Sequence, residues 1–191
     1  MAGFVTIVSG LPRCGTSMMM RMLEAGGMEL LVDHVRRPDE DNPKGYYELE
    51  VVKKIREDDS WLEGAAGKAF KMVSMLLYDL PADRNYKVIF MKRQIDEMLA
   101  SQRKMLERNG KSVANYDNGE MKRLYGNHLG EIEKWLGEQR NVDVLYVNYN
   151  DTLSSPGETA LKVIDFLGNR LDMAAMLTVV DKSLYRQRKL V

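Results

Sequence analysis

The first 25 residues constrain the fold of this chain more than any other stretch. An apolar, β-branched run at residues 4–9 leads into a loop bounded by Gly10 and Gly15, and a helix-forming segment runs from Thr16 to about Ala25. In the order strand, loop, helix, the unpaired N–H groups of the first helical turn and the positive end of the helix dipole converge on one point. The sequence therefore predicts an anion-binding site at this loop.

The spacing of the two glycines is that of a Walker A loop, which binds the phosphates of a nucleotide. Gly10 and Gly15 enclose four residues, and in nucleotide triphosphatases the next position is a lysine. Here Thr16 stands in that position, and the only cation inside the loop is Arg13. The loop thus lacks the lysine that binds phosphate in the triphosphatase pattern.

Apolar strands and amphipathic segments alternate along the rest of the chain. After the first strand, the expected strands cover 69–73, 86–91 and 142–147. The expected later helices cover 46–61, 95–108, 120–139, 150–167 and 171–180. This alternation predicts one domain over residues 1–191, an α/β three-layer sandwich with a central, mainly parallel sheet. Ligands of such sheets bind beyond the carboxyl ends of the strands.

Composition and charge argue against several classes of function. Lys+Arg and Asp+Glu are equal at 28 each, so no global basic field favours a nucleic acid or an anionic membrane as partner. The single cysteine, Cys14, excludes an intrachain disulfide and favours a reducing compartment. No stretch has the apolar length of a membrane span, and no signal peptide opens the chain. We expect a cytoplasmic protein and leave its oligomeric state open.

The hexapeptide Pro12-Arg13-Cys14-Gly15-Thr16-Ser17 resembles the phosphosulfate-binding loop of sulfotransferases that use 3′-phosphoadenosine 5′-phosphosulfate (PAPS). The family pattern is Pro, Lys or Arg, Ser, Gly, Thr, and Thr or Ser, so Cys14 replaces the usual serine with a side chain of nearly the same shape. The resemblance implies a short, bacterial-type member with the P-loop NTPase-like sulfotransferase fold. It also implies that Gly10 and the residues from Pro12 to Ser17 bind the phosphosulfate of PAPS.

A second element of the same family is similar to the segment that begins at the end of the strand 86–91. Arg93 lies at the exit of that strand, and Ser101 follows eight residues later. A guanidinium offers paired donors in a fixed fork and a hydroxyl adds another, which suits a phosphate. The resemblance implies that Arg93 and Ser101 bind the 3′-phosphate of PAPS.

The C-terminal part of the chain resembles the family's last strand and helix. The strand 142–147 leads to Tyr149, which the resemblance places near the adenine, and Asn150 or Asp151 is expected to cap the following helix. Family members also bring a basic C-terminal segment over the 3′-phosphate. Arg186 or Arg188 could take that role, and a solvated tail explains these charges equally well.

The reaction implied by the resemblance is transfer of the sulfuryl group of PAPS to a hydroxyl or amine of a small-molecule acceptor, with 3′-phosphoadenosine 5′-phosphate (PAP) as product. Arg13 would stabilise the charge that develops on the leaving oxygen. The scheme requires no metal, and the sequence contains no cluster of metal ligands. The acceptor stays open, because Arg36 and Arg37 favour an anionic one and the aromatic residues Tyr46, Tyr47 and Trp61 an apolar one.

The general base is the open part of this scheme. Cytosolic members place a histidine just after the lysine of the strand that resembles Lys71-Met72-Val73, and Val73 cannot accept a proton. The candidates are Asp33 and His34, ranked above Glu48. Two other functions remain: a small P-loop kinase, which Thr16 argues against, and a catalytically inactive nucleotide-binding protein with the sulfotransferase fold.

Overall fold

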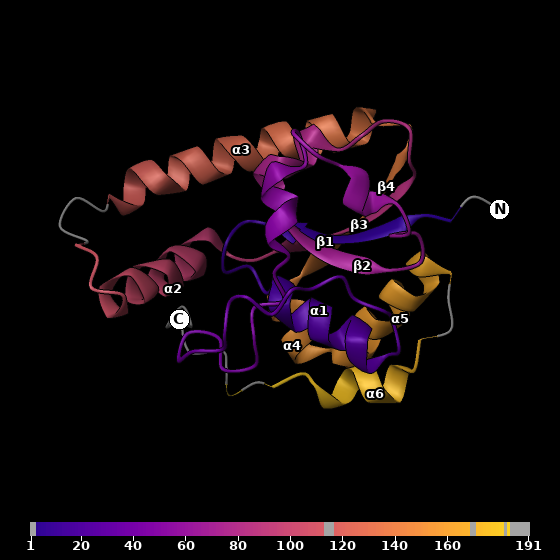
Figure 1. Cartoon of the computed structure of the whole chain (residues 1–191). Helices are drawn as coiled ribbons and strands as arrows, with labels where there is room; N and C mark the ends of the chain where they lie inside the picture. Colours follow the sequence, from indigo (N-terminus) through magenta and orange to yellow (C-terminus); the bar gives the residue numbers. More distant parts are fainter. Residues whose placement is uncertain (1–2, 113–116, 169–170, 182, 184–191) are drawn as a thin grey trace.

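The computed structural model describes residues 3–112, 117–168, 171–181 and 183. Its centre is a parallel four-stranded sheet with the strand order β2-β1-β3-β4 (Figure 1). The strands are β1 (Val5–Gly10), β2 (Ala69–Val73), β3 (Tyr86–Lys92) and β4 (Val142–Asn148). The central strand β1 is buried along its whole length, as expected for a sheet that is covered on both faces. The parallel sheet predicted from the sequence is confirmed.

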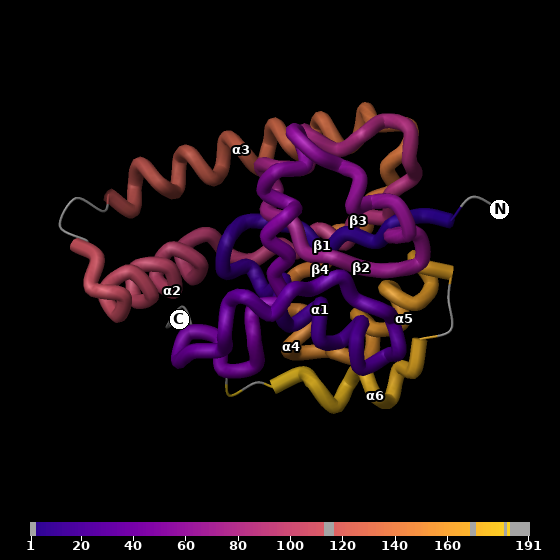
Figure 2. The backbone as a smooth tube through the Cα atoms, in the orientation of Figure 1, coloured from indigo at the N-terminus to yellow at the C-terminus, as the bar shows by residue number. Residues whose placement is uncertain are grey.

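Helices cover both faces of the sheet and complete three layers (Figures 1 and 2). One face carries α1 (Thr16–Ala25), α4 (Tyr149–Ser154), α5 (Pro156–Leu167) and α6 (Met173–Thr178). The other carries α3 (Asn118–Glu138) and the 3-10 helices η1 (Glu50–Lys54), η2 (Ser60–Leu62) and η3 (Ser74–Asp79). Successive residues of β1 enter different cores, Ile7 on the second face and Val8 on the first, because side chains alternate along a strand. The expected three-layer α/β class is thus confirmed.

The carboxyl ends of the strands meet at one edge of the sheet. Gly10 pairs in register with Val73 of β2 and Met91 of β3, and Lys92 pairs with Asn148 of β4. The helix α2 (Ile95–Arg108) follows β3 and packs beside α3 at this end of the molecule (Figure 1). The loop after β1, the exit of β3 and the start of α4 therefore come together.

The prediction of one helix over residues 46–61 is wrong, because this segment forms only η1 and η2, joined by turns. The apolar residues Leu49, Val52 and Ile55 recur every third residue, which matches the 3.0 residues per turn of a 3-10 helix. Val52 and Ile55 are both 3% exposed, so this spacing buries one narrow edge against the sheet. A regular α-helix would rotate that edge away from the core.

The helix predicted over 150–167 is two helices, α4 and α5, with Pro156 as the first residue of the second. The residue before a proline is disfavoured in the α region, and Ser155 accordingly adopts φ −131° and ψ 66°. The cap of α4 is Asn148 rather than Asn150 or Asp151. Its side-chain oxygen accepts hydrogen bonds from the backbone N–H groups of both those residues.

Within the described part of the chain, none of the helices is both long and apolar enough to cross a lipid bilayer.

Candidate functional site

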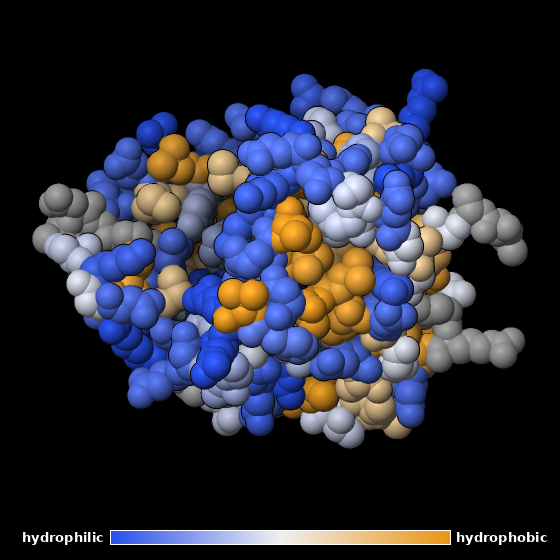
Figure 3. All heavy atoms as spheres, viewed as in Figure 1, coloured by the Kyte–Doolittle hydropathy of each residue, from blue (hydrophilic) through white to orange (hydrophobic). Residues whose placement is uncertain are grey.

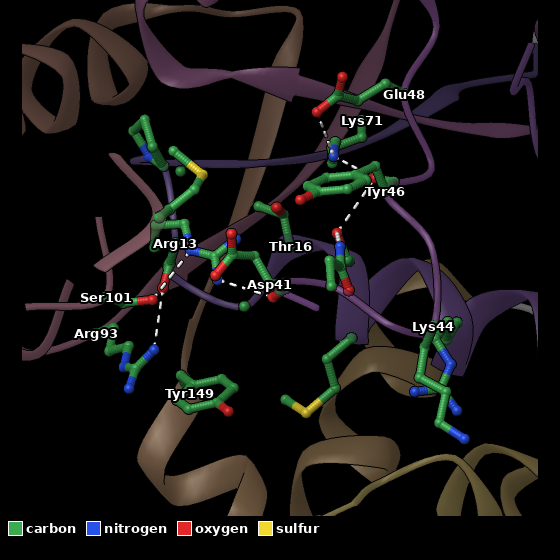
Figure 4. Close-up of a pocket in the computed structure, with 18 of the residues that line it drawn as sticks. Arg13, Thr16, Asp41, Lys44, Tyr46, Glu48, Lys71, Arg93, Ser101 and Tyr149 are labelled. Atoms are coloured by element: carbon green, nitrogen blue, oxygen red, sulfur yellow. Dashed lines mark hydrogen bonds and ion pairs between the residues drawn. The ribbon is translucent and has the colours of Figure 1, made fainter. Parts of the chain in front are cut away.

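A cavity of about 360 Å³ opens at the carboxyl edge of the sheet (Figure 4). Its walls are the loop after β1, the first turns of α1, the strap formed by residues 38–45, the end of β2, one face of α2 and the first residue of α4. All three segments that the sequence singled out therefore contribute to one cavity. This volume lies within the range of pockets that hold small molecules and cofactors.

The two glycines of the loop are fixed by close approaches. Gly10 has φ 143°, and a Cβ atom there would lie 2.5 Å from the carbonyl oxygen of Met91. Gly15 has φ 101°, and its Cβ atom would lie 2.4 Å from Cδ2 of Tyr149. The loop thus needs glycine at both positions to lie against β3 and α4. Gly15 is also the N-cap of α1, and no side chain of the described residues caps that helix.

The side chain of Cys14 points into the core and does not line the cavity. It is 1% exposed and packs among the residues between the sheet and α1. Burial raises the pKa of this thiol to about 12, so it stays protonated and neutral. Only the backbone of Cys14 is available to a ligand, whereas Pro12, Arg13, Thr16 and Ser17 all line the cavity.

Arg13 joins the first predicted motif to the second. Its Nε donates to Oγ of Ser101, 3.0 Å away, although the two residues lie 88 positions apart in the sequence. Nη1 of Arg93 donates to the carbonyl oxygen of Arg13 at 3.2 Å. Figure 4 shows these three side chains side by side on one wall. The phosphosulfate loop and the 3′-phosphate element predicted from the sequence therefore adjoin.

Arg93 is held by a buried ion pair. Its Nε donates to Oε2 of Glu97 at 3.0 Å, and the side chains are 7% and 4% exposed. Its guanidinium carbon also lies 4.5 Å from the centre of the Tyr149 ring, a cation–π distance. Sequence reasoning missed Glu97, although its position four residues after Arg93 is a recognisable helical ion-pair spacing.

The strap closes over the loop through its own polar groups. The carbonyl oxygen of Asp41 accepts from Nη2 of Arg13 at 2.9 Å, and its carboxylate accepts from Nη1 of Arg108 at 2.7 Å. Nδ2 of Asn42 donates to Oγ of Ser17 at 3.0 Å. The Ser17 hydroxyl in turn donates to the carbonyl oxygen of Tyr46 at 3.2 Å. The strap thus bonds directly to two side chains of the predicted phosphosulfate loop.

Glu48 is the candidate base that lies in the cavity. Its Oε1 accepts from Nη1 of Arg36 at 3.1 Å and lies 3.4 Å from Nζ of Lys71 (Figure 4). The side chain is 24% exposed. Lys71, on β2, also donates to the carbonyl oxygen of Tyr46, and burial lowers the pKa of its ammonium. Burial also raises the pKa of the Tyr46 phenol, to about 12, so the phenol stays protonated.

Asp33 and His34 do not line the cavity. The carboxylate of Asp33 accepts from the backbone N–H groups of Val35 and Glu50, and these bonds hold its pKa below the usual value. His34 follows in a left-handed conformation with φ 56°, which histidine tolerates better than most residues. Both residues therefore shape the turn that precedes the strap. Arg186 and Arg188 lie outside the described residues.

Positive charge gathers in the cavity although the chain as a whole is neutral. The basic side chains that line it outnumber the acidic ones, Asp41, Glu48 and Asp181. The basic residues are Arg13, Arg21, Arg36, Lys44, Lys71, Arg93, Lys104 and Arg108. Sequence reasoning missed Arg21, Lys44, Lys104 and Arg108, and the spacing of Lys104 and Arg108 after Ser101 could have revealed a shared helix face. No three His, Cys, Asp or Glu side chains of the described residues gather closely enough to hold a metal ion.

Comparisons with known proteins agree with this fold. The family model described as "Sulfotransferase domain" matches residues 5–189. A sulfotransferase from Alicyclobacillus acidocaldarius is 15% identical with a TM-score of 0.53, and the match covers 97% of this chain and 100% of that one. The sulfotransferase domain from the curacin biosynthetic pathway is 13% identical with a TM-score of 0.56, covering 95% and 79%. Mouse sulfotransferase SULT7A1, complexed with PAP, is 12% identical with a TM-score of 0.53, covering 93% and 62%. No curated protein sequence matches the chain.

Proposed function

Because the chain belongs to the sulfotransferase domain family, we propose that it transfers a sulfuryl group from PAPS to a hydroxyl or amine of a small-molecule acceptor. The observation that carries the proposal is the contact between the two anion-binding elements. Nε of Arg13 lies 3.0 Å from Oγ of Ser101, so one ligand with anionic groups at both ends can engage the loop and α2 together. PAPS is such a ligand, and when bound it supplies the sulfuryl group.

The loop residues hold the phosphosulfate end in this proposal. The N-terminus of α1 begins at Thr16 and presents its positive dipole end to the cavity. The guanidinium of Arg13 adds donors, and the hydroxyl of Ser17 adds one when it gives up its bond to the carbonyl oxygen of Tyr46. As the bond to sulfur breaks, Arg13 and the loop backbone stabilise the negative charge on the leaving oxygen.

Arg93, Ser101 and Tyr149 hold the nucleotide end. Arg93 is kept in place by Glu97 and by the ring of Tyr149, so its fork is oriented before a ligand arrives. The hydroxyl oxygen of Ser101 accepts from Arg13, and its own hydrogen can be donated to a phosphate oxygen. The ring of Tyr149 packs against Gly15 of the loop and against the guanidinium of Arg93, which is consistent with a contact to the nucleoside.

We assign the general base to Glu48. It lies in the cavity, and its carboxylate pairs with Arg36 and Lys71. These ion pairs orient the carboxylate that would take the proton from the hydroxyl or amine of the acceptor. Asp33 engages both of its oxygens with backbone N–H groups and lies outside the cavity lining. A carboxylate inside the cavity also favours an active enzyme over an inactive binding protein.

Two measurements test the proposal. Calorimetric titration with PAP and with ATP plus Mg²⁺ separates a sulfotransferase from a kinase, and Ser101→Ala should weaken PAP binding by about 1.5–3 kcal/mol, the range for hydrogen bonds to charged groups. Transfer of labelled sulfuryl to a panel of alcohols and amines should fall by about 100-fold or more in Glu48→Gln, which removes the base but keeps the shape. Glu50→Gln is the matched control, because Glu50 pairs with Lys53 outside the cavity.

Preference for ATP with Mg²⁺ over PAP would overturn the assignment of the donor. Full turnover in Glu48→Gln would overturn the assignment of the base while leaving that of the donor intact.

A further inference from the structure

We propose that the acceptor of this enzyme is an oxyanion-bearing molecule, and that Lys104 and Arg108 near the end of α2 bind its negative group. The proposal rests on the sulfotransferase function above and narrows it to a substrate class: alcohols or amines that also carry a carboxylate, phosphate or sulfate.

One face of α2 is turned to the cavity from its middle to its end. Ser101, Lys104, Met105 and Arg108 all line the cavity, and their spacings of three, four and seven residues place them on one side of a helix. The basic residue Arg103 pairs with Glu107 instead, and neither lines the cavity. The helix therefore presents two cations to the cavity beyond the serine assigned to the donor.

Arg108 already binds one carboxylate in this structure, that of Asp41. Oδ1 of Asp41 lies 2.7 Å from Nη1 of Arg108, and the Asp41 side chain is only 8% exposed. The carbonyl oxygen of the same residue accepts from Nη2 of Arg13 at 2.9 Å. Asp41 thus bridges Arg108 and Arg13, the arginine assigned to the phosphosulfate. An anionic group near Arg108 lies close to where the sulfuryl group is delivered.

Lys104 makes no hydrogen bond or ion pair with any of the described residues, although it lines the cavity. Its ammonium is therefore available to an anion in the cavity. Across the cavity, Arg36 and Lys71 add two cations beside Glu48. An acceptor that brings its hydroxyl or amine to Glu48 therefore lies between cations, which favours a negative substituent. Met105 and Val73 also line the cavity and offer apolar surface to a spacer.

The test compares acceptors that differ only in charge. para-Hydroxyphenylacetate is paired with its amide, and glucosamine phosphate with glucosamine. Binding of each member to the enzyme–PAP complex is measured by calorimetry, and KM and kcat are measured with saturating PAPS. We expect the wild-type protein to bind at least one charged member about tenfold more tightly than its neutral partner, and this preference should weaken as salt is raised.

Lys104→Gln should lower the ratio of charged to neutral affinity by about tenfold, mainly through KM of the charged member. Arg103→Gln removes the same charge from the other side of α2, so it controls for net charge and should leave the ratio unchanged. Asp41→Asn keeps the shape of the strap and removes its competing carboxylate, so it should strengthen binding of the charged member.

Equal affinity for charged and neutral members in the wild-type protein would overturn the proposal, and so would a failure of both charged members to bind. A Lys104→Gln variant that weakens PAP binding but keeps the charge preference would assign Lys104 to the donor and also overturn it. PAP binding and turnover of neutral acceptors test the sulfotransferase function separately, so its failure is distinguishable from failure of this inference.

Discussion

The ion pair between Arg93 and Glu97 predicts that the proposed donor site and the stability of the fold depend on the same arginine. The two side chains are 7% and 4% exposed, so solvent screens the pair little, and the Nε–Oε2 distance is 3.0 Å. Removing one partner of a buried ion pair typically destabilises a protein by about 3–5 kcal/mol, because the other charge stays in a low-dielectric site. Arg93→Met should therefore lower the free energy of unfolding by about that amount.

A double-mutant cycle isolates the pair. Glu97→Gln removes the carboxylate charge and keeps a side-chain oxygen near Nδ2 of Asn150, which lies 3.3 Å from Oε2 of Glu97. The double variant Arg93→Met/Glu97→Gln leaves no uncompensated charge at this position. It should be more stable than Arg93→Met alone, with a coupling energy of about 2 kcal/mol, inside the range for contacting residues. The assay is urea unfolding followed by the fluorescence of Trp61 and Trp135.

The control is Arg103→Met, which breaks the exposed pair with Glu107 on the same helix and should change the unfolding free energy by less than about 1 kcal/mol. The reasoning is refuted if Arg93→Met loses less than about 1 kcal/mol, or if the effects of the two substitutions simply add. A confirmed coupling would also mean that weak nucleotide binding by Arg93 variants reports partly on the fold. Ser101→Ala is for this reason the cleaner probe of the proposed 3′-phosphate site.

Three further predictions follow from single residues. Gly15→Ala should lower the melting temperature and abolish PAP binding, because its Cβ atom would lie 2.4 Å from the Tyr149 ring; a folded variant that binds PAP would contradict this. Cys14 should resist alkylation at pH 8 in the folded protein and react in urea, because burial raises its pKa to about 12; rapid labelling without urea would contradict this. The pKa of Asp33 is lowered in the folded state, mainly by the Glu50 N–H group, so its stabilisation is present above the unfolded pKa and is lost as pH falls through the folded one. The stability difference between wild type and Asp33→Asn should accordingly be largest above roughly pH 5 and disappear in acid, and a difference independent of pH would contradict this.

Much of the fold could be predicted because its signals are local. The run 4–9 and the strands at 69–73, 86–92 and 142–148 are mainly apolar segments, and the α2 helix begins and ends where the sequence predicts. The segment 46–61 could not be assigned correctly, since a three-residue spacing is close to the helical period and only packing against the sheet distinguishes them.

The lining of the cavity was predictable where a motif has fixed spacing, as for Arg93 and Ser101. It was not predictable where the partners are distant in sequence. Asp41 and Arg108 are 67 residues apart, and no local pattern connects them. The choice among the candidate bases likewise depends on the strap, which brings Glu48 to Lys71 and leaves Asp33 at a turn. The net charge of the chain is zero, so composition alone could not predict that basic side chains gather in the cavity.

The strap has a consequence for the order of events in a catalytic cycle. It bonds to Arg13 through Asp41 and to Ser17 through Asn42, and the chain reaches Glu48 only six residues later. In the proposed function, a phosphosulfate at the loop competes with the strap for Arg13 and Ser17, and the strap continues directly into the segment that carries Glu48, the proposed base. We therefore expect binding at the loop to influence the position of Glu48, so that the donor precedes the acceptor in the proposed cycle.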